Sequence, residues 1–223
     1  MKKAIQRIIS KDMKMCKDLD NIKVIFDEND VMKAKAIIFG LPETRYEFGC
    51  LLFDITFPKN YPFVCPIIKY IPINKIRIHP NIYACGNICL SLLGTWSGPS
   101  WTSIMDLSCI LLSIQSLLDE NPIRNEPGYE YVKGDLNDNY NKVIEYNSLN
   151  SSLIDTYLNL PEKFSCFHDD IKKFIIDNKD SINDKINKYK DSKKLEINIS
   201  LYYIHKFIID YEFISNKFNK LIL

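Results

Sequence analysis

The sequence predicts an α+β fold: a four-stranded antiparallel meander backed by a helix, with an N-terminal helix and a helical C-terminal extension. Three observations predict it. Short runs rich in β-branched and aromatic residues follow one another with turn signals between them. Apolar residues at helical spacing come before and after these runs. Beyond Gly134 the chain is rich in Asn, Lys, Asp and Ile, and strand signals become rare.

Each element follows from a local pattern. Ile5, Ile8 and Leu19 belong to an apolar stripe that predicts an amphipathic helix over about residues 2–18. Four strands are then expected, and their short connections favour an antiparallel meander. Their ranges are 22–26, 32–39, 50–57 and 66–71.

The second half of the chain begins with an irregular stretch, residues 72–101, which contains several Pro and Gly residues. A long irregular segment inside a compact domain is usually functional. Apolar residues at helical spacing return over 107–118; residues 103–106 resemble a capping box, and Asn121-Pro122 ends the helix.

Later segments are expected to be helical. One or two helices are expected over 139–160, and apolar residues keep helical spacing over 167–175 and 201–221. The charged stretch 177–194 is either a solvated helix or a loop. We take Pro161 as the boundary and predict one domain over residues 1–160 and a helical extension over 161–223.

Composition limits the function. The 223 residues carry 29 Lys and Arg against 28 Asp and Glu, and a formal net charge of +1 gives no reason to expect nucleic acid or membrane as a partner. Seven cysteines, an odd number at irregular spacing, do not indicate a secreted disulfide framework. No apolar run suggests a signal peptide or a membrane span. We expect an intracellular protein of the cytoplasm, the nucleus or both.

The irregular stretch contains the most informative motif. It reads His79-Pro80-Asn81, then Gly86-x-x-Cys89-Leu90, with the cysteine eight positions after the asparagine. This pattern resembles the active-site signature of ubiquitin-conjugating enzymes. Other segments resemble the family in the same order: Gly40-Leu41-Pro42 before Tyr46-Glu47-Phe48-Gly49, then Phe57-Pro58-Lys59-Asn60-Tyr61-Pro62-Phe63 and the helix that contains residues 111–118. The resemblance covers about residues 2–150.

Residues 89–98 and 121–130 resemble a narrower subgroup, the Z-type enzymes and the conjugating domain of the giant inhibitor-of-apoptosis fusion protein. Most of the family has one Trp eight positions after the cysteine. Here Trp96 and Trp101 follow at seven and twelve positions, which implies an insertion of about four residues beside the site.

The resemblance implies that Cys89 accepts ubiquitin, or a ubiquitin-like protein, from an activating enzyme as a thioester. Cys89 then transfers it to a substrate lysine or a ligase. A thiolate is both a good nucleophile and a good leaving group, which acyl transfer requires. Asn81 has an amide that could stabilise the oxyanion or brace the loop. No small cofactor and no metal are implied.

The resemblance implies further roles. His79 and Pro80 form a structural turn. Glu126, in the loop after the long helix, is a candidate for positioning the incoming lysine, and a solvated loop carboxylate is the alternative.

The same resemblance suggests partner-binding residues. Phe63 resembles an aromatic residue that ligases contact, while Lys2, Lys3 and Arg7 lie on a face that meets the activating enzyme. Ser103 stands where most relatives have Pro in a turn that docks ligases.

Several alternatives remain open. An isolated cysteine is more often a buried apolar residue than a nucleophile. Cys85 and Cys89 could form half of a zinc site, but no second ligand pair follows, or they could form a disulfide under oxidation. A non-catalytic ubiquitin-binding variant of the fold is the rival function. A third interpretation is an enzyme whose extension selects substrates without a separate ligase.

Overall fold

The computed structural model describes residues 1–221. The chain divides into two compact units, one of residues 1–40 and 51–119 and the other of residues 41–50 together with the chain from Glu120 onward. The first unit begins with α1 (Lys2–Arg7), a π-helical turn (Ile8–Asp12) and α2 (Met13–Met15), which together form the amphipathic helix that the sequence predicts. Its buried face includes Ala4, Ile8 and Cys16.

The sheet has four strands in the order β1-β2-β3-β4: β1 (Ile22–Phe26), β2 (Lys33–Phe39), β3 (Cys50–Thr56) and β4 (Ile67–Ile71). The first and last pairs are antiparallel, with Val24 opposite Ala36 and Ile55 opposite Ile68. The predicted α+β meander is therefore confirmed. Its strands lie within a residue or so of the predicted ranges because turn signals bound each apolar run.

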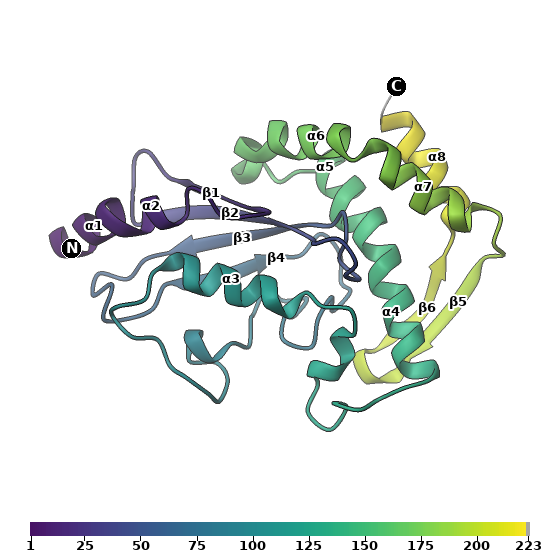
Figure 1. Cartoon of the computed structure of the whole chain (residues 1–223), viewed down its shortest axis with the longest axis horizontal. Coiled ribbons are helices and arrows are strands. Elements are labelled where there is room, and N and C mark those ends of the chain that lie inside the picture. The colour runs from purple at the N-terminus through teal and green to yellow at the C-terminus, as the bar shows by residue number, and fades with distance from the viewer. Residues whose placement is uncertain (222–223) are drawn as a thin grey trace. The chain divides into compact units, whose positions relative to one another are not determined.

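The long helix α3 (Leu107–Leu117) runs along the sheet (Figure 1) and buries Leu107, Ile110, Leu111 and Ile114. The predicted capping box is wrong, because Asp106 itself caps the helix and accepts a hydrogen bond from the Ser108 amide at 3.1 Å. Asp is a preferred N-cap residue. Arg7 contacts the backbone carbonyls that precede Asp106, which holds these residues outside the helix.

A buried carboxylate joins three parts of the first unit. Asp12 Oδ1 accepts hydrogen bonds from the Tyr61 hydroxyl at 2.5 Å and from the Leu107 amide at 2.8 Å. Tyr61 belongs to the Phe57–Phe63 motif. Burial raises the pKa of Asp12, so the two donors offset part of the cost of keeping a carboxylate in the core.

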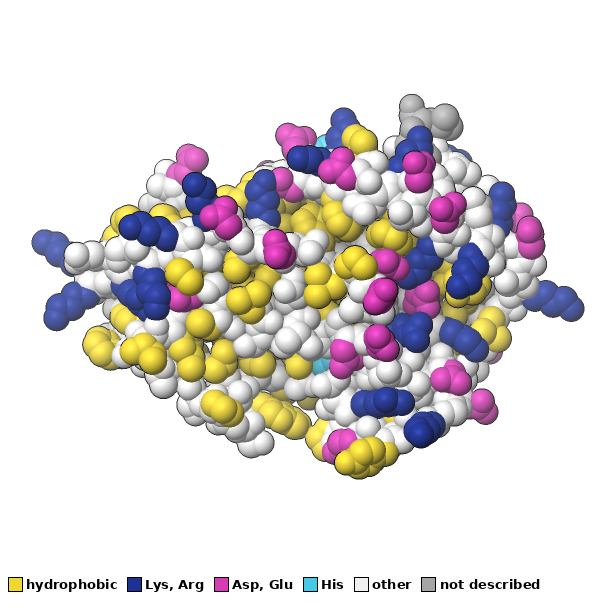
Figure 2. All heavy atoms as spheres, in the orientation of Figure 1, with side chains coloured by type: hydrophobic (Ala, Val, Ile, Leu, Met, Phe, Trp, Pro, Cys, Tyr) yellow, Lys and Arg dark blue, Asp and Glu magenta, His cyan; other side chains and the backbone are white. Residues whose placement is uncertain are grey.

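The second unit is mostly helical. Helix α4 (Asp135–Asn147) continues through a π-helical stretch (Ser148–Asp155) into α5 (Thr156–Leu158), and α6 (His168–Asp177) and α7 (Lys179–Lys190) follow. Residues 179–190 are thus a helix, and Ile182 and Ile186 are its buried side. Figure 2 shows acidic and basic side chains interspersed over the surface of α4 and α7.

The extension also contains strands, which corrects our expectation of helix over residues 201–221. Strand β5 (Leu195–Ile199) pairs antiparallel with β6 (Ile204–Ile209). A short 3-10 turn (Ser200–Tyr202) connects the two strands, and helix α8 (Tyr211–Leu221) follows them. Ile197, Ile199 and Ile204 are buried in this hairpin. β-Branched residues fit a pleated strand, and Leu201, Ile204 and Ile208, which are spaced at three and four, also mimic a helical stripe. The division into domains at residue 160 stays a prediction.

Candidate functional site

The segment between β4 and α3 is irregular but fixed by backbone pairing. Isolated antiparallel bridges join His79 to Ile82 and Ile82 to Ile88. Gly86 adopts a φ of +88°, and a Cβ there would lie 2.6 Å from the Tyr70 carbonyl oxygen, so the turn needs glycine. The same turn is tied to β4, because the Tyr70 amide donates to the Gly86 carbonyl at 2.9 Å.

Asn81 holds the backbone of Cys89 from both sides. The Cys89 amide donates to the Asn81 carbonyl at 2.8 Å, and the Asn81 Nδ2 donates to the Cys89 carbonyl at 2.9 Å. Cys89 is half-buried, so its thiol lies on a braced loop with partial access to solvent. A primary amide carries two N–H groups, and the bond to Cys89 uses one of them. Asn81 can therefore brace the loop and still offer a donor to a developing oxyanion.

His79 lies in the core of the same loop. Its side chain is fully buried, and its Nδ1 accepts a hydrogen bond from the Asn81 amide at 2.9 Å. Burial, together with the nearby Arg77 guanidinium, lowers the pKa of His79 to about 3. The imidazole is therefore neutral at physiological pH, and Nδ1 is committed to the backbone. Such a ring orients Asn81 and is poorly suited to take a proton from a thiol. The neighbouring Pro80 is buried.

Thr95 is a residue that sequence reasoning missed. Its hydroxyl donates to the Ile88 carbonyl at 2.7 Å and accepts from the Leu90 amide at 2.9 Å, so it contacts the backbone on both sides of Cys89. A short turn over Ser91–Leu93 and the left-handed Gly94 bring the chain back to make these contacts. The signal available in the sequence was a hydroxyl residue directly after that glycine.

Cys89 opens onto a groove of about 460 Å³. The N-terminal end of β4 forms one side and the Cys89 loop forms the other. The lining combines apolar side chains with a few polar ones, and includes Pro66, Ile68, Lys69, Tyr83, Asn87, Ile88 and Leu93. The Lys69 ammonium donates to the Asn87 side-chain oxygen at 2.7 Å across it. An extended peptide segment beside the thiol would find both apolar contacts and polar groups here.

The predicted partner-binding residues also lie in the first unit. Phe63 is 76% exposed, and Ser103, Lys2 and Lys3 are exposed as well. Arg7 differs, because its guanidinium donates to the Met105 carbonyl at 2.5 Å and so holds the loop before α3. An exposed aromatic side chain of this size is available for contact with another protein.

Glu126 belongs to the second unit and is half-buried. It follows a 3-10 turn (Pro122–Asn125), and its amide donates to the Ile123 carbonyl at 3.0 Å. Its carboxylate accepts a hydrogen bond from the Tyr202 hydroxyl at 2.9 Å. Tyr202 lies in the turn between β5 and β6. The sequence did not indicate this contact, which neither of the two interpretations of Glu126 included.

Comparison with known proteins identifies the family. A family model described as "Ubiquitin-conjugating enzyme" matches residues 7–148, more than half of the chain. The chain belongs to the ubiquitin-conjugating enzyme family. The matched residues include the sheet, α3 and the complete loop of Asn81 and Cys89.

Relatives within the family include the protein named ubiquitin-conjugating enzyme E2 Z. The zebrafish (Danio rerio) protein is 42% identical over 147 residues, which cover 64% of this chain and 44% of that one. The human (Homo sapiens) protein is 41% identical over 136 residues, covering 59% of this chain and 38% of that one. The match thus spans less than half the length of these relatives. Among solved structures, a ubiquitin-conjugating enzyme domain from Toxoplasma gondii is 29% identical, with a TM-score of 0.44, and the match covers 55% of this chain and 79% of that one.

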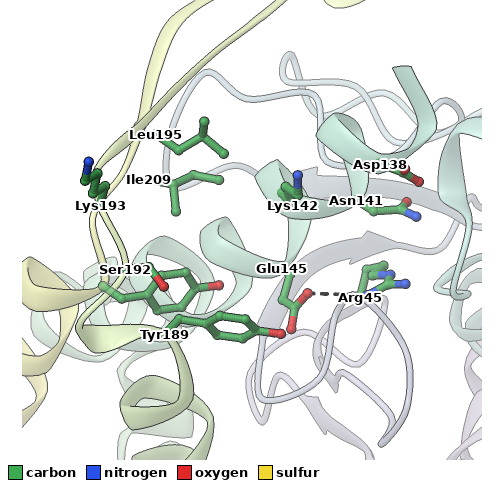
Figure 3. A pocket seen from close by; sticks show the side chains of 11 residues that line it. Arg45, Asp138, Asn141, Lys142, Glu145, Tyr189, Ser192, Lys193, Leu195 and Ile209 are labelled. Atoms are coloured by element: carbon green, nitrogen blue, oxygen red, sulfur yellow. Dashed lines mark hydrogen bonds and ion pairs between the residues drawn. The ribbon is translucent and has the colours of Figure 1, made fainter. Parts of the chain in front are cut away.

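The second unit of this family member has a pocket of its own, of about 410 Å³ (Figure 3). Glu145 on α4 lies within it and forms ion pairs with Arg45 at 3.4 Å and with Lys185 at 3.3 Å. Leu195 and Ile209 of the hairpin supply apolar lining. Over residues 1–221, no group of three or more His, Cys, Asp or Glu side chains could hold a metal ion. No helix in that same range is long and apolar enough to cross a bilayer.

Proposed function

We propose that this chain is a working ubiquitin-conjugating enzyme and that Cys89 carries ubiquitin, or a ubiquitin-like protein, as a thioester. The observation that carries the proposal is the pair of hydrogen bonds by which Asn81 holds the backbone of Cys89, at 2.8 and 2.9 Å. Rigid placement of the nucleophile accelerates acyl transfer strongly, because it keeps the attacking atom close to the carbonyl carbon.

The reaction has two steps. The Cys89 thiolate attacks the thioester carbonyl that links ubiquitin to the activating enzyme, a new C–S bond forms, and the activating enzyme's thiolate leaves. In the second step a lysine amine attacks the new thioester, a C–N bond forms, and the Cys89 thiolate leaves while the amine loses a proton to solvent. ATP is consumed upstream by the activating enzyme. The second N–H of Asn81 stabilises the oxyanion of each tetrahedral intermediate, where one donor is typically worth about 100- to 1000-fold in rate.

The partners we propose are ubiquitin or a ubiquitin-like protein, the activating enzyme, a substrate with an accessible lysine, and a ligase. Exposed Lys2 and Lys3 support docking of the activating enzyme, and exposed Phe63 supports contact with a ligase. Identity of about 42% to the Z-type protein supports a place near that subgroup. The resemblance to the conjugating domain of the giant inhibitor-of-apoptosis fusion protein stays a prediction. Seven free cysteines support work in a reducing compartment, in the cytoplasm, the nucleus or both.

A charging assay tests the proposal. The protein is incubated with Mg-ATP, ubiquitin or its relatives, and a panel of activating enzymes, and the products are separated on gels with and without a thiol reductant. We expect a ubiquitin-sized shift that the reductant removes. Cys89→Ala should abolish the shift, and Cys89→Ser should give an oxyester that resists reductant. Cys85→Ala is the matched control, because this exposed thiol lies four positions away and should be dispensable.

Two outcomes would contradict it. A ubiquitin-sized shift that survives Cys89→Ala and disappears with Cys85→Ala would show that Cys85, and not Cys89, carries the thioester. No shift with any activating enzyme and any modifier would favour the rival function, a ubiquitin-binding variant that retains the motif without using it.

A further inference from the structure

The pocket of the second unit is lined by residues of α4, α7 and the β5–β6 hairpin, and the proposed transfer at Cys89 assigns it no role (Figure 3). Its volume of about 410 Å³ is in the range of sites that bind ligands. We propose that this pocket binds a short linear segment of a partner protein, in which a large apolar side chain lies next to an acidic one. The inference goes beyond the proposed function, because it concerns binding to the second unit and not the chemistry of the thioester.

Part of the pocket lining is apolar. Leu195 of β5 and Ile209 of β6 lie opposite each other in the hairpin, and both line the pocket. The rings of Tyr189 and Tyr211 add further apolar surface, with centroids 5.0 Å apart. Leu195 remains 40% exposed, so apolar surface is still uncovered there. Burial of apolar surface favours binding, and a large aliphatic or aromatic side chain of a ligand would cover it.

The lining also includes a buried hydrogen-bond acceptor. Asn141 of α4 is only 5% exposed, and its Nδ2 donates to the Asn121 side-chain oxygen at 3.3 Å. The Oδ1 of Asn141 is buried and has no hydrogen-bond partner within residues 1–221. A buried acceptor without a donor is unfavourable, so a ligand that brings an N–H group gains affinity there. A peptide carries such a donor at every residue except proline.

The two carboxylates of the lining do not favour a basic ligand. Glu145 forms ion pairs with Arg45 at 3.4 Å and with Lys185 at 3.3 Å. Asp138, two turns earlier on α4, is exposed and accepts a hydrogen bond from the Asn137 side chain at 3.3 Å. The charge of Glu145 is therefore compensated within the chain, and the charge of Asp138 is screened by solvent.

Two lysines of the lining are available to a ligand. Lys142 on α4 and Lys193, just before β5, are exposed, and within residues 1–221 neither forms an ion pair or a hydrogen bond. The neighbouring Lys194, by contrast, is part of an ion pair. Figure 3 shows Lys142 and Lys193 on opposite sides of Leu195 and Ile209. An acidic side chain next to the apolar one would therefore find an ammonium group on either side.

Binding of short peptides to the full chain tests the inference. The glutamate peptide is an N-acetylated, C-amidated tetrapeptide of the sequence glycine, phenylalanine, glutamate, glycine. The lysine peptide has lysine in place of glutamate, and the glycine peptide has glycine in place of phenylalanine. Each peptide is titrated into isotope-labelled protein. The backbone amide signals in NMR spectra then report both the affinity and the residues that the peptide perturbs.

We expect the glutamate peptide to bind saturably and to perturb signals of pocket residues such as Lys193 and Leu195. The lysine and glycine peptides should bind about tenfold more weakly, since each loses one of the two contacts. In the double variant of Lys142→Glu with Lys193→Glu, affinity for the glutamate peptide should fall about tenfold and affinity for the lysine peptide should rise. Lys190→Glu is the matched control, because Lys190 is exposed and does not line the pocket.

Several results would overturn the inference. These are the absence of saturable binding, equal affinity for all three peptides, tighter binding of the lysine peptide, or perturbed signals outside the pocket. An affinity for the glutamate peptide that survives the double charge reversal would also overturn it. Higher ionic strength provides a measurement without a variant, because it should weaken binding of the glutamate peptide, and an unchanged affinity would refute the role of charge. Since binding is measured before any thioester is formed, the result is independent of whether Cys89 accepts ubiquitin.

Discussion

Acidification should destabilise the first unit through one buried side chain, His79. In the folded chain burial keeps its imidazole neutral and lowers the pKa to about 3, from an ordinary value of 6.5. Between these values the unfolded chain binds more protons than the folded chain, so the free energy of unfolding rises with pH. The stability is therefore fully present above about pH 6.5 and is lost progressively as the pH falls towards 3.

The size of the effect follows from the two values. One pKa unit corresponds to about 1.4 kcal/mol, so the whole difference between 6.5 and about 3 is worth roughly 5 kcal/mol. At pH 5 roughly 2 kcal/mol should already be lost. For a chain of 223 residues, this lowers the melting temperature by about 4–8 °C.

Urea unfolding at pH 7 and pH 5, followed by tryptophan fluorescence, measures this loss. Trp96 and Trp101 both lie in the first unit, so the signal reports on the unit that contains His79. Other groups also titrate in this range, so the informative quantity is the pH-dependent change in the difference between wild type and His79→Asn. That variant cannot titrate and keeps a side-chain oxygen as an acceptor.

A second variant protects the test if His79→Asn folds poorly. His168 and His205 are the other histidines, and both are exposed. The double variant His168→Asn with His205→Asn should keep the wild-type dependence on pH. An equal loss of stability by wild type and His79→Asn between pH 7 and pH 5 would rule out His79 as the source of the effect. Loss of the pH dependence on replacing His168 and His205 would do the same.

Three further predictions concern the loop and its supports. Thr95→Val, which keeps the side-chain shape but removes the hydroxyl, should slow ubiquitin charging about tenfold, whereas Thr95→Ser should charge nearly normally; equal charging rates would contradict a bracing role. Gly86→Ala should lower the free energy of unfolding in urea by at least about 1–3 kcal/mol, because φ is +88° and the new Cβ would lie 2.6 Å from the Tyr70 carbonyl oxygen. An unchanged unfolding midpoint would contradict this. Tyr61→Phe should cost about 1–3 kcal/mol in the same assay, because Asp12 loses a buried donor, and an unchanged midpoint would argue that water replaces the hydroxyl.

The sequence predicted the sheet well because strands in this chain are short apolar runs bounded by turn residues. It predicted the residues that lie together, His79, Asn81 and Cys89, because one continuous segment contains all three. It did not predict Thr95 or the hydrogen bonds of Arg7. The contacts of Thr95 and Arg7 depend on the three-dimensional path of the backbone, and no local sequence pattern specifies them.

The hairpin was missed for a related reason. Leu201, Ile204, Ile208 and Tyr211 keep a helical spacing of three or four, while the isoleucines at 197, 199, 204, 208 and 209 favour strands. Pairing between β5 and β6 decides in favour of strands, since each segment gains backbone hydrogen bonds only from the other. The contact between Tyr202 and Glu126 could not be predicted before that pairing was known.

The hydroxyl of Thr95 has a consequence for how chain length can change in evolution. It closes a small ring of backbone from Ile88 to Thr95 that contains Cys89. Residues 96–100, just outside the ring, are all exposed. The entropy of closing a loop grows only slowly with its length, so residues can be gained or lost there at small cost. Within the ring, any insertion would break the contacts that position the thiol. The insertion of about four residues that the Trp spacing implies would therefore be accommodated at 96–100, and a change of chain length there would leave the geometry around the thiol unaltered.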